Sequence, residues 1–116
     1  MASPRKINLG VFAAGELPYP VAHRFVSNEE PIDLTDFTAF ANIEGPDETV
    51  AVGVGTVTIE GDPTDGIVSY TWVEDDFVGV GKYKMLLWVE SISGANRFAS
   101  DLIVYEVYDG PGPTPT

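Results

Sequence analysis

The sequence contains no cysteine among its 116 residues. Without a thiol, the chain cannot form disulfides, thiolate nucleophiles, iron–sulfur clusters or cysteine-ligated zinc sites. The folded state must therefore be stabilised by side-chain packing, by strand pairing or by a partner protein.

Positive charge is also scarce. Six Lys and Arg residues stand against eighteen Asp and Glu residues, which gives a formal net charge of −12. Because a surface of this sign repels a polyanion, we expect no nucleic-acid partner. The same charge can complement a basic surface on a partner protein, although it also serves solubility alone.

Long apolar runs are absent as well. The N-terminal sequence MASPRKINLGVFAAG has two basic residues and then only a short apolar run, which Asn8 and Gly10 interrupt. Such a segment fits neither a secretory signal nor a membrane span. We therefore expect a protein that is made in the cytoplasm and has no membrane partner.

Side chains that carry out catalysis are few. The only histidine, His23, alternates with Val21 and Phe25, which is typical of a packed strand residue, and no serine lies in a nucleophile-elbow motif. Two acidic clusters lack calcium-loop spacing and are interpreted as solvated loops. They are Glu29, Glu30, Asp33 and Asp36, and Glu74, Asp75 and Asp76. The sequence thus predicts no catalytic residue, no metal site and no cofactor.

What the sequence does contain is a series of short extended segments rich in β-branched and aromatic residues. They span residues 7–13, 21–27, 37–43, 50–59, 67–73, 82–90 and 97–108. Glycine and proline turn signals separate them, and the best helical candidate, residues 28–37, contains Pro31. Since this length suits one domain, the pattern predicts an all-β antiparallel β-sandwich or small barrel of about seven strands.

One segment carries a change of phase. Val50, Val52 and Val54 share one alternation phase, whereas Val57 and Ile59 occupy the other. A bulge or tight turn at one of the intervening glycines is expected to split this segment into two strands.

The stretch from residue 65 to residue 94 predicts two strands and an acidic connection. In its second strand, alternation assigns four residues to the core and leaves Leu86 and Trp88 on the opposite face. The four core residues are Tyr83, Met85, Leu87 and Val89. Tyr83 follows Gly81 by two residues and is either a corner tyrosine bonded to upstream backbone or another half-buried strand aromatic.

Two segments have apolar residues on both faces, which indicates cover on both sides. We interpret Leu86 and Trp88, together with Ile103, Tyr105 and Val107 of the last segment, as a candidate partner interface. The alternative cover for Leu86 and Trp88 is the protein's own N-terminal segment or a long loop.

The two ends differ from the middle of the chain. We expect residues 1–20 to form an N-terminal arm with the first strand, residues 21–108 the sandwich, and residues 109–116 a proline-rich tail. The tail sequence PGPTPT favours an extended polyproline conformation.

Several elements are ordered as in a known phage family. They are PIDLT at 31–35, DGIVSYTW at 65–72, DF at 76–77, GKY at 81–83, SG at 93–94, and Phe98. Together they resemble the Ig-like β-sandwich of tailed-phage baseplate upper proteins, where it lies at the N-terminus, and of short accessory virion proteins. The resemblance covers residues of roughly 21 to 108 and leaves both ends of the chain outside it.

The resemblance implies a non-enzymatic virion subunit, present in multiple copies in a particle and bound to capsid, connector or tail proteins. Because the chain shows no further receptor-binding domain, we expect an accessory subunit, and we place it on or near the capsid. The alternatives are a tail or baseplate subunit, and a carbohydrate-binding or adhesive module that uses Tyr19 and Phe77. A small hydrolase, the remaining alternative, needs paired carboxylates in a cleft, and no pair is singled out by spacing.

Overall fold

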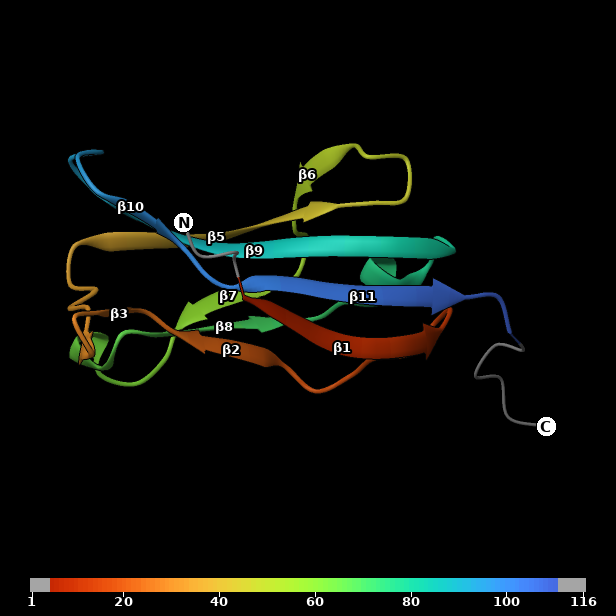
Figure 1. Cartoon of the computed structure of the whole chain (residues 1–116), viewed down its shortest axis with the longest axis horizontal. Helices are drawn as coiled ribbons and strands as arrows, with labels where there is room; N and C mark the ends of the chain where they lie inside the picture. Colours follow the sequence, from red (N-terminus) through yellow and green to blue (C-terminus); the bar gives the residue numbers. More distant parts are fainter. Residues whose placement is uncertain (1–4, 111–116) are drawn as a thin grey trace.

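A computed structural model describes residues 5–110, and all of its strands except the β3–β4 hairpin form two stacked β-sheets (Figure 1). The strands are β1 (Lys6–Ala13), β2 (Val21–Arg24), β3 (Val26–Ser27), β4 (Glu30–Pro31), β5 (Phe37–Glu44), β6 (Val50–Val52), β7 (Thr56–Ile59), β8 (Ile67–Thr71), β9 (Gly81–Ser91), β10 (Arg97–Ala99) and β11 (Leu102–Tyr108). Two 3₁₀ turns, η1 (Pro63–Asp65) and η2 (Glu74–Phe77), complete the elements. The all-β sandwich prediction is confirmed, and residues 111–116 of the predicted tail lie outside the described residues.

The larger sheet has the order β1-β11-β9-β5-β6, with β10 also paired to β9, and the smaller sheet has the order β2-β8-β7. A separate hairpin pairs β3 with β4. One pairing departs from the antiparallel prediction, because β1 runs parallel to β11. The first strand is thereby part of the larger sheet.

The core lies between the two sheets and follows the predicted alternation. Met85, Leu87 and Val89 are buried, and Tyr83 packs against them as a partly buried residue. An aromatic cluster continues the core at one end, where the Trp72 ring makes edge contacts with the rings of Tyr70, Phe77 and Tyr105. Such edge-to-face pairs add specific geometry to the apolar burial.

Tyr83 is a corner tyrosine. Its hydroxyl donates a hydrogen bond of 2.5 Å to the carbonyl oxygen of Gly79, and its ring stacks on that of Tyr105 at a centroid distance of 4.8 Å. The hydroxyl therefore fixes the loop that leads into β9, which is the role of corner tyrosines in Greek-key sandwiches.

The predicted break after β6 is confirmed. The chain leaves the larger sheet after Val52 and enters the smaller one at Thr56. At the crossing, the Gly55 N–H donates a hydrogen bond of 2.8 Å to the hydroxyl of Tyr70. A core side chain thus supplies the backbone partner at the point where the strand ladder is interrupted.

Two other predicted strands are interrupted. Residues 21–27 break at Phe25, which separates β2 from β3, and residues 97–108 break at Ser100. The Ser100 hydroxyl accepts a hydrogen bond from the Leu87 N–H and donates one to the carbonyl of Asp101. Because this side chain replaces a ladder bond, β10 and β11 form separate strands. The described part of the chain contains no helix long and apolar enough to cross a membrane.

Candidate interaction surface

The face of the larger sheet that points away from the smaller sheet carries an apolar cluster. Trp88 lies opposite Phe40 on the neighbouring strand, and their rings stack at a centroid distance of 6.3 Å and an interplanar angle of 8°. Leu86 and Leu102 line one shallow hollow with Trp88. We call this face the outer face, and we call Phe40, Leu86, Trp88, Leu102 and Val104 the outer apolar cluster.

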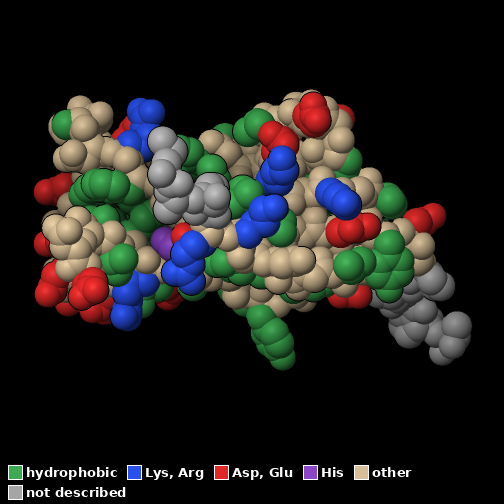
Figure 2. Space-filling model, viewed as in Figure 1, with side chains coloured by type: hydrophobic (Ala, Val, Ile, Leu, Met, Phe, Trp, Pro, Cys, Tyr) green, Lys and Arg blue, Asp and Glu red, His purple; other side chains and the backbone are tan. Residues whose placement is uncertain are grey.

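Charged side chains surround the cluster. They are Lys6, Glu44, Lys82, Lys84, Glu90, Arg97 and Glu106, all at outward strand positions. The Lys84 ammonium lies 3.8 Å from a Glu44 carboxylate oxygen, and the Arg97 Nε donates a hydrogen bond of 2.6 Å to Glu90. Figure 2 shows Lys and Arg side chains gathered along the strands of the larger sheet.

These positions divide the charge of the molecule unevenly. Four Lys or Arg and three Glu side chains give the outer face a net charge of +1, which leaves −13 for the remainder of a chain of −12. A near-neutral rim around an aromatic and aliphatic centre has the composition of a protein-binding surface.

The indole N–H of Trp88 is buried and has no hydrogen-bond partner among the described residues. Leaving a buried donor unpaired costs about 1–3 kcal/mol.

The structure places the predicted interface residues in two groups. Leu86 and Trp88 lie half-buried on the outer face, as alternation predicted. Ile103, Tyr105 and Val107, in contrast, are each at most 2% exposed within the protein's own core. Assigning these three residues to an interface was wrong, because their side chains, at alternate positions of β11, point toward the smaller sheet. Leu102 and Val104 occupy the outward phase of β11 instead.

A second candidate site surrounds Asp76, which the sequence placed in a solvated loop. That interpretation was wrong for this residue, which is only 6% exposed. The Tyr70 hydroxyl and the Val73 N–H each donate a hydrogen bond to Asp76 Oδ2, at 2.9 and 3.0 Å. The Tyr105 hydroxyl donates to the Asp76 carbonyl at 3.2 Å.

Burial raises the pKa of Asp76 above its ordinary value, against the opposing effect of the hydrogen bonds from Val73 and Tyr70. Burial likewise raises the pKa values of Tyr70 and Tyr105. The sequence does signal that Asp76 caps a turn. Asp76 follows Val73 by three residues, a spacing that lets its carboxylate accept the Val73 N–H, and the next residue, Phe77, is buried.

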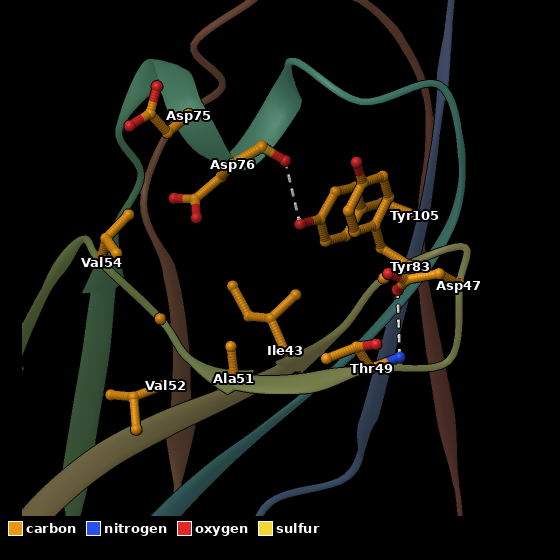
Figure 3. A pocket seen from close by; sticks show the side chains of 12 residues that line it. Ile43, Asp47, Thr49, Ala51, Val52, Val54, Asp75, Asp76, Tyr83 and Tyr105 are labelled. Carbon is orange, nitrogen blue, oxygen red and sulfur yellow. Dashed lines mark hydrogen bonds between the residues drawn. The ribbon is translucent and has the colours of Figure 1, made fainter.

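A cavity of about 300 Å³ opens beside this network (Figure 3). Ile43 and Ala51 give it an aliphatic side, and the rings of Tyr83 and Tyr105 close another. Asp47, Asp75 and Asp76 also line the cavity, and its lining includes no Lys, Arg or His. The cavity thus combines apolar walls with negative charge.

The remaining residues considered from the sequence are His23, Tyr19 and Phe77, and none of them lines either of the two candidate sites. His23 packs edge-on against the Phe25 ring at 4.7 Å, and burial lowers its pKa, as expected for a packed strand histidine. Tyr19 is 93% exposed, but Phe77 is fully buried, so these two side chains do not form the glycan platform considered above. Within residues 5–110, His, Asp and Glu side chains form no group of three that could hold a metal ion.

The fold occurs in a phage protein. The chain matches the N-terminal domain of phage TP901-1 ORF48 with a TM-score of 0.56, over 90% of this chain and 98% of that domain, at 13% sequence identity. At this identity the likeness shows a shared fold. No protein-family model and no curated protein sequence matches the chain.

Proposed function

We propose that this chain, which shares its fold with a phage protein domain, is a non-enzymatic structural subunit of a tailed-phage virion. It acts as an accessory protein on or near the capsid and binds other virion proteins through the outer apolar cluster. A tail or baseplate position is the alternative location for the same kind of subunit. The two supports are the shared fold and the composition of the outer face.

The outer face carries this proposal. Burying large side chains such as Trp88 and Leu86 against a partner contributes roughly 25 cal/mol for each Å² of apolar surface removed from water. The Lys and Glu side chains around them supply the polar rim that fixes orientation. The five strands of this face have 8, 7, 11, 8 and 3 residues, and at about 3.3 Å per residue and about 4.8 Å between strands they cover about 600 Å². One side of a standard protein interface is about 800 Å², so this face supplies most of such an area.

Particle fractionation tests the proposal. Virions assembled with the wild-type chain are purified, the chain is detected by immunoblotting, and its position is located by electron microscopy. We expect the wild-type chain to sediment with the particles and to label the head or its junction with the tail. Labelling of the distal tail would support the baseplate alternative, and absence of the chain from particles would overturn the assignment to the virion.

Paired variants test the surface. Leu86→Glu places a charge within the outer apolar cluster, whereas Ile92→Glu makes the same change at a 74% exposed position in the turn after β9. We expect the first variant to be lost from particles and the second to be retained, with both folded by circular dichroism. Equal incorporation of both variants would show that the interface lies elsewhere.

A further inference from the structure

One edge of the larger sheet, β6, lacks a strand partner on its outer side. The Gly53 N–H donates to the Ala41 carbonyl, and the Gly45 N–H donates to the Thr49 carbonyl. These bonds show that Thr49, Ala51 and Gly53 direct their backbone groups toward β5. The N–H and carbonyl groups of Val50 and Val52 consequently point away from the sheet.

The side chains of this edge are apolar and exposed. Val50 and Val52 are 58% and 67% exposed, and β6 contains no charged residue and no proline. The opposite edge, β1, is interrupted by a register shift between Asn8 and Val11. Natural sheets usually protect their edges with charges, prolines, bulges or very short strands. β6 is short, at three residues, but it carries none of the other three forms of protection.

The cavity beside Asp76 adjoins the same edge. Ala51 and the following residues Val52, Gly53 and Val54 contribute to its lining. Asp75 lies near Val54 at one side of the cavity, and Asp47 lies beside Thr49 at the other (Figure 3). A strand added beside β6 directs alternate side chains to the two sides of the sheet. Those on the inner side lie next to the cavity, and those on the outer side lie next to Val50 and Val52.

We propose that the β6 edge binds an extended segment of a partner protein in which apolar residues alternate with Lys or Arg. The Val50 and Val52 backbone groups hydrogen-bond to the added strand. Apolar side chains of the segment pack beside the two valines, while its cations are drawn to the carboxylates of Asp47 and Asp75. A second copy of this chain fits less well, because its own edge is flanked by Asp47 and Glu48 and brings like charge.

This edge adjoins the outer apolar cluster, because Val50 also lines the hollow formed by Leu86, Trp88 and Leu102. The backbone groups of Val50 and Val52 and the carboxylates of Asp47 and Asp75 lie outside that cluster, so changes to them test the edge by itself. The probe is the peptide acetyl-Lys-Val-Lys-Val-Lys-Val-Lys-amide, titrated into the ¹⁵N-labelled full chain. We expect saturable shifts of the Val50 and Val52 amide signals. The same peptide with Glu in place of Lys should bind about tenfold more weakly, because its charge is reversed next to the carboxylates.

Two sets of protein variants separate strand addition from charge. Val52→Pro removes an outward N–H, leaves the bonds to β5 intact, and should abolish the shifts; if that variant does not fold, Val52→Lys should weaken binding of the Lys peptide through like charge. Asp47→Asn with Asp75→Asn should also weaken binding. Glu29→Gln with Asp65→Asn removes the same charge near β3 and η1, at the other end of the sandwich (Figure 1), and should not.

Three results would overturn the proposal. They are the absence of saturable shifts, equal affinity for the Glu peptide, and unchanged binding by the folded Val52→Pro variant. A dimer in sedimentation that Val52→Pro abolishes would assign the edge to a second copy of the chain instead.

Discussion

At the scale of single residues, Asp76 shows how one buried carboxylate organises several elements. It caps the turn at Val73, accepts the hydroxyl of Tyr70 from β8, and its backbone carbonyl receives the hydroxyl of Tyr105 from β11. The cost of burying a carboxylate is offset by these hydrogen bonds only in part, since the pKa of Asp76 is raised.

The raised pKa predicts a pH dependence of stability. Because the folded state holds the Asp76 proton more tightly than the unfolded state, this group's contribution to stability is complete below pH 3.8 and is lost as the pH rises through the folded-state pKa. The free energy of unfolding of the wild type, relative to Asp76→Asn, should therefore fall over this range and then level off. Urea unfolding at a series of pH values measures the difference. Asp75→Asn controls for the lost charge, and a difference that grows with pH would contradict the assignment.

At the scale of elements, the corner between β6 and β7 lets one continuous segment contribute a strand to each of the two sheets. Gly55 sits where a side chain has no room, since a Cβ there would lie 2.2 Å from the Thr71 carbonyl oxygen and 2.7 Å from the Tyr70 ring. The corner therefore depends on close approach of the backbone to a core aromatic residue.

Replacing this glycine should be strongly destabilising. We expect Gly55→Ala to lower the free energy of unfolding by about 3 kcal/mol or more, because backbone and a packed ring must both move. Gly94→Ala is the matched control. Its Cβ meets nothing within 4 Å, and its positive φ of 80° should cost only about 1 kcal/mol. Chemical denaturation of both variants measures the two losses, and equal losses would show that the contact at Gly55 is unimportant.

The alternation of apolar and polar residues predicted most of the strands. It failed where a side chain takes the place of a backbone hydrogen bond between strands. The glycine-rich run predicted the β6–β7 corner, and the period of two predicted the core face of β9. The break at Ser100 escaped prediction because it depends on a hydrogen bond from Leu87, thirteen residues away. The sequence also did not predict which face of β11 is buried. Both phases of that strand are apolar, so only its pairing with β1 and β9 determines which phase is buried.

At the scale of the whole molecule, the separation of charge is the dominant electrostatic feature. The outer face is near neutral, while the remainder of the molecule carries −13 and repels itself. The described residues form three ion pairs, in each of which the basic side chain is exposed and the acidic one is partly exposed: Arg5–Asp101, Lys84–Glu44 and Arg97–Glu90. Pairs of this kind contribute little to stability.

Salt should therefore stabilise the protein. Raising the ionic strength from about 0.01 to 0.15 M shortens the Debye length from about 30 to 8 Å and screens the repulsion among carboxylates. We expect Tm to rise over this range in calorimetric scans at pH 7. A fall in Tm would mean that the surface ion pairs outweigh the repulsion.

The parallel pairing of β1 with β11 has a mechanical consequence. Lys6 pairs with Leu102 at one end and Ala13 pairs with Tyr108 at the other, so the chain enters and leaves this strand pair at opposite ends. Tension applied between residues 6 and 108 would slide the two strands lengthwise and load their hydrogen bonds together rather than one after another. Single-molecule pulling with handles at these positions should record one high-force rupture instead of gradual unzipping.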